Sequence, residues 1–287
     1  MTVERTRDLN WNAPRRGVAV ALRQLAQLEQ AGGGSRGQIE QFWYDFYERE
    51  LTGWAVPGGL QKYRRELSGR GIVIAAGSAY FRRLVYQLRS LQSFGCLVGT
   101  TVEVYHCRED PLTDPEIAFL WSEFAITPVL IDPLFPEAPP KSIKLLTLKL
   151  YGALASRLKE VLLVDHDAVF LESPERWFEA REYQAEGALF FLDRQLHPGN
   201  YGYVQWLLEH FPQPYSPAVQ RGDVVSQRSS FQQDSSLVVL NKARGLLGLI
   251  AATRLTHPDV TSGFRKNFAD DKEALWHGFE LAGAAFA

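Results

Sequence analysis

From Gly71 onward, short apolar runs alternate with longer helical patterns, and this alternation constrains the fold more than any other feature of the sequence. The runs typical of strands are GIVIAA at residue 71, TVEVYHC at 101, TPVLID at 127, EVLLVDHD at 160, GALFFLDR at 187 and SSLVVLNK at 235. Strands separated by helices predict βαβ units and an α/β fold, with a mostly parallel sheet flanked by helices. The carboxyl ends of parallel strands share one edge, where ligands of open α/β sheets bind.

The segments between these strands carry helix signals. The pattern SAYFRRLVYQLRSLQSF ends at Gly95. The pattern LTDPEIAFLWSEF offers Thr113 or Asp114 as an N-cap and Pro115 in the first turn, which predicts a helix start. A long apolar helix is predicted for SIKLLTLKLYGALASRL, and a closing helix for KEALWHGFELAG.

The character of the sequence changes near residue 70. Before it, GVAVALRQLAQLEQ and QIEQFWYDFYEREL have helical patterns, and AGGGSRG between them predicts a flexible joint. We therefore predict an N-terminal helical region over residues 1–69 that braces one α/β domain over residues 70–287.

Composition excludes several classes of protein. Hydrophobic residues make up 46% of the 287 residues, which is enough for a sizeable core. The balance of 31 Lys+Arg against 33 Asp+Glu argues against nucleic acid as a partner. The two cysteines form neither a disulfide framework nor a zinc-binding pattern. No apolar run reaches the roughly 18 residues of a membrane span, and no signal peptide is recognisable. The expectation is a soluble, cytoplasmic chain with no membrane span.

Two carboxylates lie at the end of the run EVLLVDHD, and they are the most informative residues of the sequence. Asp165 and Asp167 are two residues apart, so in an extended segment their side chains point the same way. Carboxylate oxygens suit a hard divalent cation, and such a cation can bridge the oxygens of a diphosphate. The structural alternative is a solvated strand end.

Two classes of enzyme use such a pair. Nucleotide-sugar glycosyltransferases hold a metal on the donor diphosphate with it, whereas haloacid-dehalogenase-like phosphohydrolases use one Asp as nucleophile and the other as acid/base. The sequence DHDAV fits both. In the second class the pair usually follows the first strand of the core, but here three strand–helix units precede it. Lys266 also lies only four residues before Asp270, too close for a separate strand and loop. The order of the elements favours the glycosyltransferase.

Five blocks, in order, resemble the fungal α-mannosyltransferases that extend mannan and N-glycan outer chains from GDP-mannose. The blocks are GIVIAAGSAYF, LKLYGALASRLKEVLLVDHDAVFLESPERWFE, EGALFFLDR, DSSLVVLNK and DDKEALWHGFELAG. The resemblance runs from about residue 40 to the end. It implies a GT-A fold, Mn²⁺ as cofactor, and retaining transfer of mannose from GDP-mannose to a mannan or N-glycan acceptor. In this family the reaction belongs to protein glycosylation in the Golgi.

The resemblance also implies roles for residues around the DXD motif. Asp165 and Asp167 would be the metal and donor ligands, and Gly77 and Ser78 would line the nucleotide pocket through backbone groups. His166 stands where the family usually has a small residue, and we expect it to pack behind its neighbours.

Further roles are implied for residues on other elements. Lys149, Asp193 and Arg194 would face the donor or the acceptor. Lys149 is equally consistent with a side chain that reaches to the surface, and Arg194 with a surface ion pair. Asp234 and Asp271 would be the catalytic acidic residues.

The chain departs from the family's pattern in its later blocks. Ser236 and Asp270 replace expected glycines, and the sequence ends at Ala287, soon after the closing helix. The family is anchored in the Golgi membrane, but no anchor is recognisable here. These departures predict a C-terminally truncated enzyme with impaired transfer. The alternative is a degenerate relative that binds nucleotide or glycan without turnover.

Overall fold

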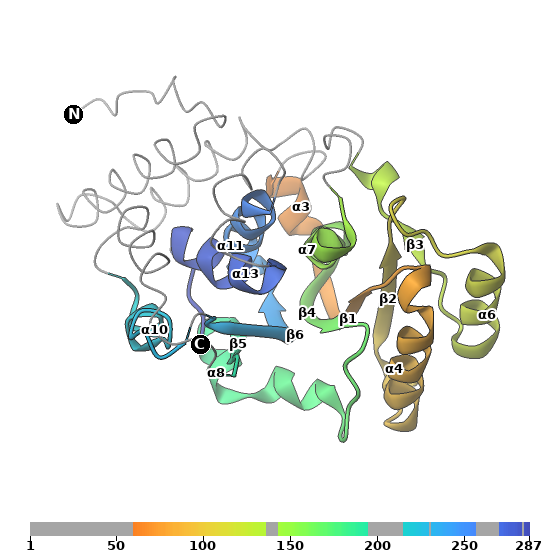
Figure 1. Cartoon of the computed structure of the whole chain (residues 1–287), viewed down its shortest axis with the longest axis horizontal. Helices are drawn as coiled ribbons and strands as arrows, with labels where there is room; N and C mark the ends of the chain where they lie inside the picture. Colours follow the sequence, from red (N-terminus) through yellow and green to blue (C-terminus); the bar gives the residue numbers. More distant parts are fainter. Residues whose placement is uncertain (1–59, 136–142, 195–214, 230, 257–269, 283) are drawn as a thin grey trace.

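The computed structural model describes residues 60–135, 143–194, 215–229, 231–256, 270–282 and 284–287 (Figure 1). Most of the predicted N-terminal helical region therefore lies outside the described residues. Its last part forms α3 (Leu60–Glu66), which leads directly into the first strand. Tyr63 of α3 is buried in the core of the domain. The division of the chain near residue 70 stays a prediction.

The described residues form a six-stranded sheet in the order β3-β2-β1-β4-β6-β5. Its strands are β1 (Ser68–Ala75), β2 (Thr101–His106), β3 (Val129–Leu130), β4 (Leu158–Asp165), β5 (Ala188–Leu192) and β6 (Gln233–Asn241). The first four strands of that order are parallel, whereas β6 runs antiparallel to both of its neighbours. The prediction of a mostly parallel sheet is confirmed.

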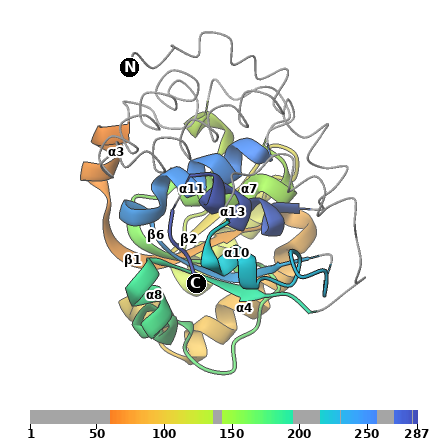
Figure 2. The same ribbon diagram turned by 90° about the vertical axis from the view of Figure 1, so that its left-hand side faces the viewer.

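Alternate residues of the longer strands enter separate cores on the two faces of the sheet. In β1, Val73 faces one core and Ile72 and Ile74 face the other. Helices α7 (Leu145–Ala155), α11 (Lys242–Leu255) and α13 (Asp270–Leu281) cover the first face. The second is covered by α4 (Phe81–Ser93), α6 (Asp114–Phe124), η3 (Pro174–Glu179) and α8 (Arg181–Glu186). Figure 2 shows α7, α11 and α13 on one side of the sheet and α4 and α8 on the other.

Local signals set the ends of several helices as expected. Thr113 is the N-cap of α6, and its backbone N–H donates to the Glu116 side chain at 2.8 Å. Gly95, with a φ of 75°, follows α4 and precedes the short α5 (Cys96–Gly99). The remaining short elements are η1 (Ser78–Tyr80), η2 (Asp132–Leu134) and α10 (Pro217–Arg221).

β3 and α11 differ from expectation, and the short helices α8 and α10 were not predicted either. β3 has two residues, because Asp132 and Pro133 turn the chain into η2 directly after it. Helix α11 was not predicted, since its glycines disfavour a helix. In the structure, Gly245 and Gly248 lie against the Phe279 ring of α13, where a Cβ would come within 2.7 Å and 2.5 Å of ring atoms. The glycines therefore allow two helices to pack closely.

Helices in the described part of the chain are all too short or too polar to serve as a membrane span. Cys96 and Cys107 are both buried free thiols.

Candidate active site

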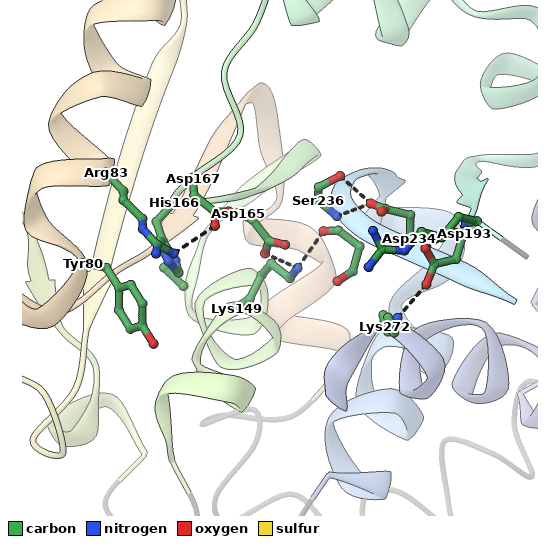
Figure 3. A pocket seen from close by; sticks show the side chains of 13 residues that line it. Tyr80, Arg83, Lys149, Asp165, His166, Asp167, Asp193, Asp234, Ser236 and Lys272 are labelled. Atoms are coloured by element: carbon green, nitrogen blue, oxygen red, sulfur yellow. Dashed lines mark hydrogen bonds and ion pairs between the residues drawn. The ribbon is translucent and has the colours of Figure 1, made fainter. Parts of the chain in front are cut away.

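A pocket of about 540 Å³ opens where β1 and β4 end and where β6 begins. Because β6 is antiparallel, its first residues meet the carboxyl ends of the parallel strands at one edge. The pocket is lined by Ala75, Tyr80, Arg83, Lys149, Asp165, His166, Asp167, Asp193, Arg194, Asp234, Ser235, Ser236 and Lys272 (Figure 3). It thus combines four carboxylates with four Lys or Arg side chains, which suits a ligand that carries both phosphate and sugar hydroxyl groups.

Lys149 holds the centre of the pocket together. Its Nζ donates to Asp165 Oδ1 at 2.6 Å and to the backbone carbonyl of Ser235 at 2.7 Å. The side chain of Lys149 is 5% exposed and that of Asp165 is 34% exposed. Lys149 therefore does not reach to the surface; it joins α7, β4 and β6 and fixes the position of the first carboxylate.

The second carboxylate of the pair has a more open environment. Asp167 accepts a hydrogen bond from Arg83 of α4 at 3.2 Å, and both side chains are about half exposed, at 49% and 58%. Between the two acids, the ring of His166 packs against Tyr80 with centroids 4.3 Å apart. Burial lowers the pKa of the His166 imidazole below its ordinary value, so it is neutral at pH 7.

The opposite wall of the pocket comes from β5, β6 and α13. Lys272 Nζ lies 2.6 Å from Asp193 Oδ2 and 4.2 Å from the centroid of the Phe231 ring. Asp234 accepts the backbone N–H of Ser236 at 2.7 Å. Arg194 is exposed at the end of β5. Figure 3 shows Asp193, Asp234 and Lys272 gathered on the side away from Asp167.

The predicted nucleotide-facing residues Gly77 and Ser78 lie just beyond this lining. Ser78 Oγ donates to Glu116 at 2.9 Å. A Cβ on Gly77 would come within 2.3 Å of the Asp110 backbone oxygen, so the close approach requires glycine. Ala75 and Tyr80 line the pocket at this point. The role of Gly77 and Ser78 stays a prediction.

Asp271 lies in the first turn of α13, and its side chain is outside the described part of the structure. Its catalytic role stays a prediction. Its neighbour Lys272 lines the pocket instead.

Sequence reasoning missed Tyr80, Arg83 and Lys272 as pocket residues. Tyr80 and Arg83 are three residues apart, a spacing that places side chains on one helix face, directly after the first strand. That spacing was an available signal. Lys272 had no comparable signal, because its contact with Asp193 joins segments far apart in the sequence.

The structure thus places a pocket lined by carboxylates and by Lys and Arg side chains at the strand ends of a mostly parallel α/β sheet. The model of the family described as "Mannosyltransferase putative" matches residues 69–287, and the chain belongs to this family. The resemblance to fungal mannosyltransferases is thereby confirmed.

Curated relatives agree with this assignment. The Candida albicans proteins named "Putative alpha-1,3-mannosyltransferase" MNN14 and MNN13 are 24% and 26% identical over 147 and 151 residues. Each alignment covers 47% of this chain but only 21% and 19% of the relative. The chain therefore spans about a fifth of the length of these relatives.

Solved glycosyltransferases are more distant neighbours. The galactosyltransferase LgtC, with donor and acceptor sugar analogues, is 14% identical with a TM-score of 0.47, covering 76% of this chain and 73% of its own. The mannosyltransferase Ktr4p from S. cerevisiae is 11% identical with a TM-score of 0.47, covering 88% and 75%. Likenesses this distant add nothing to the family assignment.

Proposed function

We propose that the chain transfers mannose from GDP-mannose to a mannan or N-glycan acceptor, with a divalent cation such as Mn²⁺ and with retention at the anomeric carbon. Membership of the mannosyltransferase family supports mannose as the transferred sugar. The observation that supports a metal and a diphosphate donor is the placement of Asp165 and Asp167 at the end of β4, in one pocket with Lys149 and Arg83. Carboxylate oxygens and phosphate-binding cations are the groups that a metal–diphosphate complex needs.

The residues present fit a divalent cation only if the nucleotide helps to bind it. Among the described residues, no group of three His, Cys, Asp or Glu side chains is arranged to hold a metal ion. Asp165 and Asp167 would therefore supply two ligands, and diphosphate oxygens would supply others. When bound there, the cation would offset the negative charge that develops on the departing diphosphate.

The chain's own side chains have distinct roles in this proposal. Lys149 keeps Asp165 in place through its bond to the Ser235 carbonyl. Arg194 is exposed and available to the phosphates or to sugar hydroxyl groups, whereas Lys272 neutralises Asp193. Asp234 lies on the wall opposite Asp167, where it would face the transferred sugar. The acceptor hydroxyl then approaches from the face that the diphosphate leaves.

Two alternatives make different predictions. A phosphohydrolase would form an aspartyl-phosphate on one carboxylate of the pair. The order of the strands argues against this class, because β1, β2 and β3 all precede the strand that bears the pair. A degenerate relative would bind GDP without transferring mannose.

Binding of GDP by the whole chain, measured by calorimetry with and without Mn²⁺, tests the proposal. GDP should bind more tightly than UDP or ADP, and only with Mn²⁺. Asp167→Asn should weaken this binding by about 10–100-fold, since it removes a charge-assisted contact. The control is Glu172→Gln, an exposed acid on the same segment that pairs with Arg176 outside the pocket.

Equal binding by wild type and Asp167→Asn would rule out the metal site, and a preference for UDP would rule out the donor. Transfer from labelled GDP-mannose to mannobiose, with NMR of the new linkage, then tests turnover and retention. Binding without transfer would favour the degenerate relative.

A further inference from the structure

The two carboxylates of the DXD motif are neutralised by cationic side chains of unequal burial. Lys149 is almost fully buried and bonds both Asp165 and the Ser235 carbonyl. Arg83 is 58% exposed and contacts Asp167 with one nitrogen at 3.2 Å. Figure 3 shows Arg83, Tyr80 and Asp167 together on one side of the pocket, apart from Lys149.

This difference decides which carboxylate becomes available to a divalent cation. Separating a buried ion pair leaves uncompensated charge in a poorly solvated site, whereas an exposed pair separates at little cost. Asp167 is therefore the carboxylate that releases its partner when a cation enters. Asp165 can use its second oxygen while Lys149 stays in place.

A released Arg83 remains beside the ligand. It extends from the first turn of α4 and lines the pocket, with its guanidinium carbon 5.4 Å from the centroid of the Tyr80 ring. A guanidinium presents a planar fork of donors that matches two phosphate oxygens. A diphosphate that binds with the cation would offer such a pair of oxygens.

We propose that Arg83 is an exchangeable counter-ion, which neutralises Asp167 in the absence of a divalent cation and binds the donor diphosphate once the cation has taken Asp167. The inference rests on the proposed function. It makes Arg83 a competitor of the metal and a ligand of the nucleotide. Each ligand therefore favours the other, and the coupling between them is reciprocal.

Replacing Arg83 tests this, because the two effects have opposite signs. In Arg83→Ala, Mn²⁺ alone should bind up to about fivefold more tightly, since its competitor is gone. GDP in the presence of Mn²⁺ should bind about 10–100-fold more weakly, because a charged phosphate contact is lost. Both affinities of Arg83→Lys should lie between those of wild type and of Arg83→Ala, because lysine keeps the charge but not the planar fork of donors. Both constants are measured by calorimetry on the whole chain.

The matched control is Arg89→Ala. Arg89 lies on the same helix and pairs with Glu123 of α6 at 3.3 Å, with exposures of 54% and 44% that resemble those of the Arg83 pair. It is not among the residues that line the pocket. Both constants should stay at wild-type values.

The outcomes separate this inference from the proposed function. If wild type shows Mn²⁺-dependent GDP binding but Arg83→Ala binds both ligands as wild type does, the exchange is wrong and the proposed function stands. If Arg83→Ala weakens Mn²⁺ binding as well, Arg83 merely positions Asp167, which also overturns the exchange. If wild type binds no GDP with Mn²⁺, both proposals fail.

Discussion

The sheet has two parts that build opposite walls of the pocket in different ways. The parallel part comprises β3, β2, β1 and β4 with α4, α6 and α7, and it supplies the acid pair and Arg83. The mixed part comprises β6 and β5 with α11 and α13, and it supplies Asp193, Asp234 and Lys272. In the parallel part, β1 pairs with β2 and β2 with β3 in chain order, but β1 also pairs with the distant β4. In the mixed part, β6 lies between β4 and β5, out of chain order. The comparison shows that both walls depend on pairing between distant strands, and that only the second adds a strand that runs antiparallel to its neighbours.

Lys149 joins the two parts, and replacing it should have the largest effect. Lys149→Met leaves the Asp165 carboxylate without its ammonium partner and the Ser235 carbonyl without its donor. We expect a loss of about 3 kcal/mol in the free energy of unfolding, since one member of a largely buried pair is removed. Urea unfolding measures the loss.

A second substitution sharpens that test. Asp165→Asn in the Lys149→Met background removes the stranded charge and should restore part of the stability. A loss below about 1 kcal/mol in the single variant would mean that Lys149 acts like an exposed ion pair and does not link the two parts.

A substitution within the mixed part should destabilise that part and leave the stability of the parallel part unchanged. A Cβ on Gly278 of α13 would lie 2.3 Å from the Ala252 backbone nitrogen and 2.6 Å from the Gly248 carbonyl oxygen. Gly278→Ala should therefore push α11 and α13 apart and cost about 2 kcal/mol. Hydrogen exchange should rise in these two helices and stay low in β1 and β2.

The control for this variant is Gly99→Ala, because an added Cβ there would meet no atom within 4 Å. Its stability should change by less than about 0.5 kcal/mol. Faster exchange across the whole sheet in Gly278→Ala would show that the two parts unfold as one unit.

A smaller effect is expected at Lys242, which makes a second link between the parts. It begins α11, and its Nζ donates to the carbonyls of Ala153 and Ser156 at 2.8 Å and 2.6 Å and to the Tyr63 hydroxyl at 3.1 Å. Burial lowers the pKa of Lys242 to about 7. The lysine of the unfolded chain keeps its proton up to about pH 10.

Between pH 7 and 8 the unfolded state therefore binds more protons, and stability should rise with pH by up to about 1.4 kcal/mol per unit. Burial raises the pKa of Cys96 and of Cys107 above the ordinary value of a thiol. Above about pH 8 the folded state therefore binds more protons at these thiols, and they lower the stability as the pH rises. The stability of Lys242→Met should not show this rise between pH 7 and 8. Identical pH slopes in the two proteins would show that the three oxygens keep the ammonium protonated.

The sequence predicted the parallel part well, because its signals are local. Apolar runs located β1, β2 and β4, and Thr113 with Pro115 located the start of α6. The Asp pair was placed correctly at a strand end, since β4 ends at Asp165. Its partners were not predicted, because Arg83 and Asp167 lie 84 residues apart and meet only in the folded chain.

The mixed part was less accessible to sequence reasoning. Its strands were located, but the position of β6 between β4 and β5 depends on pairing that no local pattern encodes. Helix α11 was missed because glycine lowers helix propensity, and its benefit appears only when Phe279 packs on Gly245 and Gly248. Contacts between distant segments outweighed the local preference.

The position of the pocket at strand ends has a consequence for how such an enzyme can diversify. Within β4, residues 161–164 are fully buried between two cores, so exchanges there would cost packing energy. Asp167, Arg194 and Ser236 lie past or near the strand ends and are exposed, and exchanges at such positions usually alter stability little. The framework and the ligand preference can therefore vary almost independently. Under the proposed function, exchanges at this rim would change the nucleotide or sugar that a related chain binds while the sheet beneath it is kept.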